Sequence, residues 1–272
     1  MITVPASPPA VPAKWSDLAD ELDRWAQEGR TATLWWRDDD AAAPSRRLDD
    51  LLATAGSMPV ALAVIPALAQ PALAGWLRQL PAVWVLQHGW LHANRTVTGK
   101  KSEFPASRAK AEVTADLVEG RSRLKALFGG RALAVLAPPW NHFGDGLLPL
   151  LAANALGAIS RVKPRPTAWP ATGVYEANVH VDLVAWRGDR GFVGEPAALS
   201  GLVGHLRARR TGLADADEPT GILTHHLVQA RATGDFLGRL LALTRAHRAA
   251  RWLDAAEVFA PALGIPATAD PA

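Results

Sequence analysis

Short apolar runs alternate with amphipathic segments along most of the chain. The run at 59–65 (PVALAVI) is apolar throughout, which is typical of a strand that is buried on both faces of a parallel sheet. The segments between such runs carry apolar residues three and four positions apart, which indicates helices with one buried face. Because strand and helix alternate about seven times without a break, the pattern predicts a single α/β domain with a parallel sheet, either open or closed into a barrel.

The same pattern sets the expected bounds of each element. We expect strands at 31–36, 59–65, 83–86, 132–137, 156–160, 179–184, 221–224 and 251–253. We expect helices at 16–30, 45–55, 71–80, 107–128, 146–154, 196–210 and 232–248. Ser16 and Ser45 are suited to begin their helices as N-caps, and Gly129 is suited to end the longest one. A flexible leader is expected at 1–14, the domain at 15–262 and a tail at 263–272.

Composition narrows the functional classes. Of 272 residues, 49% are apolar, the net charge is +3 and cysteine is absent. The basic residues are scattered, without the stripe that follows a nucleic-acid backbone. No apolar run approaches the ~20 residues of a membrane span, and the N-terminus lacks a signal-peptide pattern. We expect a cytoplasmic protein that binds neither nucleic acid nor membrane, in which any metal is held by histidines and carboxylates. The oligomeric state is left open.

Polar residues gather where the expected strands end, which is where α/β folds build their sites. Asp38, Asp39 and Asp40 follow the first strand, and His88 and His92 follow the third. If the residues after His88 coil into one helical turn, both imidazoles face one side and can hold a metal ion. Taken alone, the pair is more often two polar loop residues. A zincin-type metalloprotease is disfavoured, because Gly89 stands where that motif needs glutamate.

The ordered set of strand-end residues resembles the polysaccharide deacetylase family (NodB homology, carbohydrate esterase family 4). That family carries an Asp-Asp pair, His-x-x-x-His, Arg-x-Pro-aromatic, Asp-x-x-x-Trp and Leu-x-His, in this order. The matching residues here are Asp39-Asp40, His88 to His92, Ala137 to Trp140, Asp182 to Trp186, and Leu223 to His225. The resemblance spans about residues 31–260. It implies an irregular (β/α)7 barrel and a metal-dependent hydrolase that removes an acyl group, expected to be N-acetyl, from an amino sugar or a related small amide.

Residue by residue, the resemblance also implies roles. Asp40, His88 and His92 would hold one divalent ion, with Zn²⁺ as the expected ion. Asp39 would be the general base and His225 the catalytic acid, with Asp182 orienting the imidazole of His225. Contacts with the substrate, a small or oligomeric N-acetylated sugar, are expected from four residues: Pro139, Trp140, Asn141 and Trp186.

The chain departs from the family pattern at two positions, as in a divergent branch. Ala137 stands where the family has the arginine that pairs with the base, so we expect Arg37 or Arg161 to supply the cation. Ala41 stands where the family usually has glycine after the Asp pair. We prefer Asp39 as base and Asp40 as ligand, because the small Ala41 then takes the place of that glycine. The alternative register uses Asp38 as base and Asp39 as ligand.

Two other functions fit the same residues. One is a catalytically inactive carbohydrate-binding or regulatory domain, and the other is a metal hydrolase of a different carbon–nitrogen bond. A pure binder needs neither the base Asp39 nor the acid His225, so the presence of both favours an enzyme.

Overall fold

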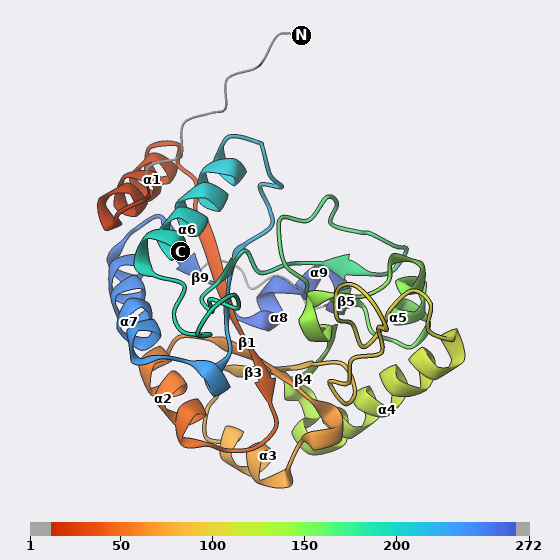
Figure 1. Cartoon of the computed structure of the whole chain (residues 1–272). Helices are drawn as coiled ribbons and strands as arrows, with labels where there is room; N and C mark the ends of the chain where they lie inside the picture. Colours follow the sequence, from red (N-terminus) through yellow and green to blue (C-terminus); the bar gives the residue numbers. More distant parts are fainter. Residues whose placement is uncertain (1–11, 265–272) are drawn as a thin grey trace.

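The computed structural model describes residues 12–264, and its strands run parallel in one curled sheet (Figure 1). The sheet order is β6-β5-β4-β3-β2-β1-β8-β7, with β9 paired beside β1. The strand bounds are β1 Ala32–Ala41, β2 Val60–Val64, β3 Val83–Gln87, β4 Ala132–Leu136, β5 Ala158–Ile159, β6 Tyr175–Glu176, β7 Val181–Asp182, β8 Thr220–Thr224 and β9 Ala250–Trp252.

One extended stretch joins the two edges of this sheet. β6 pairs with β5, and β7, only a few residues later, pairs with β8. Between them, the backbone N–H of Ala177 donates to Ile159 and that of His180 donates to Gly221. Residues 175–182 therefore act as a single irregular strand, and the sheet curls into the (β/α)7 barrel. The expected fold is confirmed.

Helices pack around the outside of the strands (Figure 1). They are α1 Trp15–Gln27, α2 Arg46–Ala55, α3 Pro71–Leu77, α4 Lys110–Phe128, α5 Pro149–Ala153, α6 Glu195–Arg210 and α7 Arg231–Ala246. Alternate residues of β1 show how the two sides of the sheet differ. Leu34 and Trp36 pack outward against the helices, while Trp35 packs among the inward residues. Each such apolar side chain contributes roughly 1.5–3 kcal/mol when fully buried.

Small side chains fill much of the barrel interior, including Ala61, Ala63 and Ala177. Two short C-terminal helices that the sequence pattern did not predict, α8 Ala255–Val258 and α9 Ala260–Leu263, cover this interior at one end. Phe259 packs edge-on against Trp35, with ring centroids 5.6 Å apart. Ala262 lies against Gly157, just before β5 begins. The C-terminal helices thus close the barrel at the N-terminal ends of its strands and leave the other end for a site.

Three local expectations are wrong. α1 begins at Trp15 with Lys14 as its N-cap, so Ser16 lies inside the helix. β1 does not end before the aspartates but runs through them to Ala41. The residues from His88 to His92 do not form a helical turn; they form an irregular loop in which Gly89 and His92 have positive φ angles. The predicted leader and tail fall largely in 1–11 and 265–272, which are outside the described residues. Within residues 12–264, no helix is long and apolar enough to cross a membrane.

Candidate metal centre and catalytic pocket

The three consecutive aspartates point to different surroundings because β1 is irregular at its end. The pairing of β1 with β2 shifts register between Asp38 and Ala41, and Asp40 has a positive φ of 71°. Strict alternation along the strand is thereby broken, so Asp39 and Asp40 both line the pocket. Asp38 instead is buried against the end of β8, the other neighbour of β1 in the sheet. There it accepts hydrogen bonds from the Thr224 hydroxyl (2.7 Å) and the His226 backbone N–H (3.0 Å).

Asp40, His88 and His92 bring one ligand atom each within 4.8 Å of one another. The Nε2 atoms of His88 and His92 lie 3.2 Å and 3.3 Å from Oδ1 of Asp40. That oxygen is buried and has no hydrogen-bond partner within residues 12–264, as expected of an atom that is free to bind a cation. Nδ1 of His88 donates to the Ala137 carbonyl at 2.8 Å, which leaves the lone pair of Nε2 for a metal. One carboxylate and two imidazoles suit a divalent ion such as Zn²⁺.

The charges around this triad favour an ionised Asp40. Burial works to raise the pKa of Asp40, but His88, His225 and His92 outweigh it and hold the pKa well below its usual range. Burial likewise works to lower the pKa of His88, yet Asp39 and Asp40 raise it overall. For His92, burial and the neighbouring His88 lower the pKa.

The loop that carries the two histidines is held by a buried carboxylate. Glu103, which is fully buried, accepts the backbone N–H groups of Trp90 (3.1 Å) and Leu91 (2.8 Å). Gly89 sits so tightly that a Cβ there would lie 2.0 Å from the Glu103 carboxylate and 2.7 Å from Pro139. Only glycine fits this position, which also has a φ of 62°. Pro139 is therefore a buried support behind the loop, and it is not among the residues that line the pocket, where a substrate contact was expected.

Arg37 forms a bidentate ion pair with Asp39. Its Nε and Nη2 donate to the two carboxylate oxygens at 2.8 Å and 3.0 Å, and both side chains are almost completely buried. The guanidinium also donates to Ser160 and, at 2.5 Å, to the side chain of Asn141. Arg161 points elsewhere and pairs with Glu176 and Asp145. Of the two arginines, Arg37 is the one that contacts Asp39.

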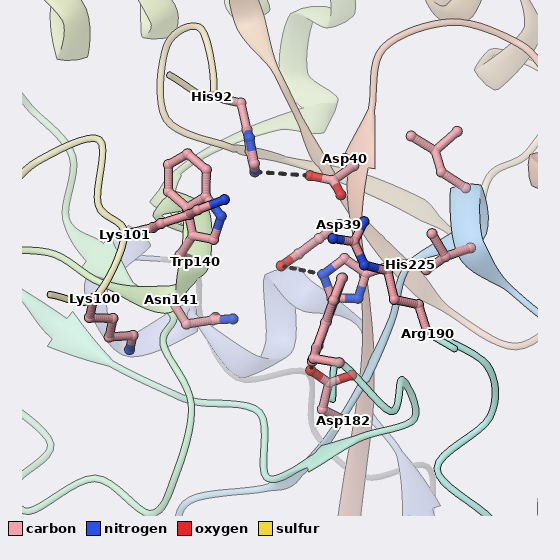
Figure 2. Close-up of a pocket in the computed structure, with 13 residues that line it drawn as sticks. Asp39, Asp40, His92, Lys100, Lys101, Trp140, Asn141, Asp182, Arg190 and His225 are labelled. Atoms are coloured by element: carbon pink, nitrogen blue, oxygen red, sulfur yellow. Dashed lines mark hydrogen bonds and ion pairs between the residues drawn. The ribbon is translucent and has the colours of Figure 1, made fainter. Parts of the chain in front are cut away.

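His225 follows β8 and faces Asp39 across the pocket, with 3.9 Å between Nε2 and Oδ2 (Figure 2). The edge-on Trp186 ring packs against it, with centroids 4.7 Å apart. Asp182, which is expected to orient the imidazole of His225, accepts no hydrogen bond from it among the described residues. Asp182 accepts instead from Trp186 Nε1 (2.7 Å) and from the Val184 N–H, and Nδ1 of His225 has no partner among the described residues. Burial raises the pKa of Asp182, although His225 acts in the opposite direction.

These side chains surround a cavity of about 700 Å³. Trp140 lies against His92, with ring centroids 4.4 Å apart, and it turns into the cavity because Trp140 and Asn141 both have positive φ angles. The cavity also has five lining residues to which the sequence analysis gave no role: Lys100, Lys101, Arg190, Leu227 and Val228. The two lysines lie in the long polar loop after His92, where no motif or periodicity could have placed them at the site.

Solved structures with this arrangement of elements are found at low sequence identity. A "putative polysaccharide deacetylase" from Mycobacterium smegmatis is 16% identical, covers 97% of this chain and 99% of its own, and has a TM-score of 0.60. A carbohydrate esterase family 4 esterase from Streptococcus mutans is 12% identical, with 87% and 90% covered and a TM-score of 0.55. The Bc1960 peptidoglycan N-acetylglucosamine deacetylase, in complex with an N-oxidanyl-benzamide, is 14% identical, with 90% and 97% covered and a TM-score of 0.52. The chain has the polysaccharide deacetylase fold.

The sequence itself is distant from this group, since no protein-family model and no curated protein sequence matches it. Within the deacetylase fold, the clearest local departure is Ala137. Its side chain is small and buried, but its carbonyl still holds Nδ1 of His88. The cation beside Asp39 comes from β1 itself, two residues before that carboxylate.

Proposed function

We propose that this protein is a metal-dependent hydrolase that removes an acyl group, N-acetyl in the simplest case, from an amino sugar or a related small amide. The observation that carries the proposal is the meeting of two sets of groups at one cavity. Asp40, His88 and His92 form a ligand set, and Asp39 and His225 lie beside it, 3.9 Å apart. The fold shared with deacetylases and esterases supports the same chemistry.

Each catalytic group would have one task. The chemistry that a divalent ion supplies, when bound, is to polarise the amide carbonyl and to make water a stronger acid. The Asp39 carboxylate accepts a proton from the attacking water as the new carbon–oxygen bond forms. His225 gives a proton to the nitrogen as the carbon–nitrogen bond breaks, so the products are a carboxylate and a free amine. Arg37 keeps the buried Asp39 oriented through its two hydrogen bonds.

The aromatic walls would position the acyl group and the sugar. Trp186 is fixed by its hydrogen bond to Asp182, and Trp140 is fixed by its contact with His92. Flat apolar rings on both sides suit a sugar ring or an acetyl methyl. Asp182 therefore acts through Trp186 in this proposal, rather than through a hydrogen bond to His225.

The test combines metal content with acetate release from a panel of N-acetylated sugars. Purified protein is expected to carry about one divalent ion per chain, and His88→Ala or His92→Ala should lose most of it. Asp39→Asn should keep the metal and lose roughly 10²–10⁴-fold in rate, the usual range for a general base. Asp145→Asn, an exposed carboxylate outside the cavity, is the matched control.

Three outcomes would contradict the proposal. Metal content that is unchanged in both histidine variants would remove the ligand set. An unchanged rate in Asp39→Asn would remove the base. Metal-loaded protein that hydrolyses none of the amides but binds sugars would favour the carbohydrate-binding alternative.

A further inference from the structure

The cavity has three basic side chains without a charge partner in the part of the chain that the structure describes. Lys100, Lys101 and Arg190 line it, and none forms a hydrogen bond or an ion pair with residues 12–264. Lys100 and Lys101 stand on the side of Trp140 and Asn141, while Arg190 comes from the loop after β7, on the side of Asp182 and His225 (Figure 2). The basic residues that serve the fold behave differently. Arg37 and Arg161, for example, are both held by carboxylates.

The acidic residues of the cavity do not need these three cations. Asp39 is paired with Arg37, Asp40 belongs to the ligand set, and Asp182 is hydrogen-bonded to Trp186. Lys100 also stands among like charges. Its pKa is lowered first by burial and then by the positive charges of Lys163 and Arg161. The outer wall therefore has an excess of positive charge, and a divalent ion at Asp40, His88 and His92 would increase it.

We propose that the substrate of this cavity carries an anionic group, a phosphate or a carboxylate, and that Lys100, Lys101 and Arg190 bind it. This inference rests on the function proposed above and names its substrate class: an acylated amino sugar with a negative charge. Ammonium and guanidinium groups are the usual partners of phosphates and carboxylates, and arginine adds a two-pronged hydrogen bond. A neutral glycan could accept hydrogen bonds from these donors, but only an anionic group would neutralise their charge.

The size of the cavity agrees with a small anionic ligand. About 700 Å³ lies in the usual range for a site that encloses one small molecule. All three cations are on exposed residues, so their charge also reaches into solvent and would attract an anion as it approaches. Such attraction weakens as salt is added, which gives the proposal a distinctive signature.

The experiment measures binding by calorimetry, without turnover, on the metal-loaded Asp39→Asn protein. The probes are N-acetylglucosamine, its 1-phosphate and 6-phosphate, and N-acetylmuramic acid, which carries a carboxylate. We expect at least one anionic sugar to bind about tenfold or more tightly than the neutral one, with the ratio falling from about 0.05 M to 0.5 M salt. If the sugar phosphates show the larger increase in affinity over the neutral sugar, the preferred group is a phosphate. If N-acetylmuramic acid does, it is a carboxylate.

Variants then assign the effect to the three side chains. Lys100→Gln, Lys101→Gln and Arg190→Gln should each weaken anion binding by about three- to tenfold, and the triple variant should remove the preference. Affinity for neutral N-acetylglucosamine should fall much less than affinity for the anionic sugar in each of them. Arg187→Gln, on the same loop as Arg190, and Lys110→Gln, on α4, are exposed controls outside the cavity and should bind like the parent protein.

Two results would overturn the inference: equal binding of all four sugars, or a preference for anions that persists in the triple variant. The second would mean that the anion binds at the metal centre instead. Acetate release from the same sugars by the unmutated protein tests the proposed function separately. Tight anion binding without acetate release would therefore leave the subsite in place and contradict only the hydrolase.

Discussion

At the residue scale, Arg37 takes up the position beside Asp39 that the resemblance assigns to an arginine at 137. Residues two apart on a strand face the same side, so Arg37 can reach Asp39 from within β1. The fork of the guanidinium matches the carboxylate, and its remaining N–H groups are used by Ser160 and Asn141. A lysine at this position could not make all of these contacts.

Arg37→Lys should therefore lower both turnover and stability. We expect a loss of about tenfold or more in kcat/KM, because the orientation of Asp39 is no longer fixed. The free energy of unfolding should fall by a few kcal/mol, since a buried pair loses its geometry. Arg161→Lys is the matched control and should leave kcat/KM unchanged. The assays are steady-state kinetics and denaturant unfolding, and equal kcat/KM for Arg37→Lys and the parent protein would contradict the prediction.

The sequence identified most of the residues around the cavity but not how each is used. Its motifs led to Asp39, Asp40, His88, His92 and His225, all of which the fold brings together. It preferred Asp39 and Asp40 from the small residue at position 41, but it left the register of Asp38 and Asp39 open, because the shift that turns Asp38 away depends on pairing with another strand. For the same reason, it could not foresee that Asp182 bonds to Trp186 or that Pro139 is buried behind Gly89.

At the scale of elements, the loop from His88 to His92 depends on a carboxylate from outside the motifs. Glu103 is fully buried, and its two oxygens accept from Trp90 and Leu91 within the loop. The loop contains no helix that would fix its shape locally. The positions of both imidazoles thus rely on a residue that lies eleven positions after His92 in the chain.

Glu103→Gln should weaken metal binding while the fold is kept. A glutamine oxygen can accept one of the two backbone N–H groups, but its NH₂ group opposes the other. Changes in the groups that support metal ligands typically cost 10–100-fold in affinity, so we expect a rise of about that size in the Kd of the metal. The Kd is measured by competition with a chelator, and circular dichroism reports the fold. Glu119→Gln, exposed on α4, is the control. An unchanged Kd of the metal in Glu103→Gln would contradict the prediction.

The elements themselves were easier to predict than the loops between them. Apolar runs marked most of the strands, because each is buried on both sides of a parallel sheet. The loops that carry Lys100, Lys101 and Arg190 have no periodicity, and their course is set by contacts with distant parts of the chain. The placement of these three basic residues at the cavity could therefore be found only from the structure.

At the scale of the whole molecule, repeated strand–helix pairs predicted a parallel sheet, while closure of the barrel came only from the resemblance. The closing stretch at 175–182 pairs through two strands of two residues each, too short to give a distinct pattern. A buried cluster of His180, His205 and Glu218 lies near the first residue of β8, away from the cavity.

This cluster is better described as a hydrogen-bonded joint than as a second metal site, although its ligand atoms lie within 4.8 Å of one another. Nδ1 of His180 accepts the Gly221 N–H at 2.9 Å, so the neutral ring carries its proton on Nε2, the atom nearest Glu218. Both Glu218 oxygens already accept backbone N–H groups. The two imidazoles stack with centroids 3.4 Å apart, which disfavours a positive charge on both at once.

The joint should make the protein less stable in acid. Burial first, and then His180 and Arg209, lower the pKa of His205 to about 2, and burial likewise lowers the pKa of His180. Below the ordinary pKa of about 6.5, the unfolded chain binds protons that the folded chain excludes, so stability is complete above that value and is lost as the pH falls. His205 alone should remove about 2 kcal/mol from the free energy of unfolding between pH 7 and pH 5.

Denaturant unfolding at pH 7 and pH 5 measures this loss directly. His205→Gln, which keeps a polar group near Thr220 but cannot be protonated, should reduce the loss by about 2 kcal/mol relative to the parent protein. His247→Gln is the control, because His247 lies near the surface beside Asp23. Groups outside this cluster, such as His226 with its raised pKa, titrate equally in all three proteins and cancel in the difference. If His205→Gln shows the same pH dependence as the parent protein, the buried joint is not what makes the barrel sensitive to acid.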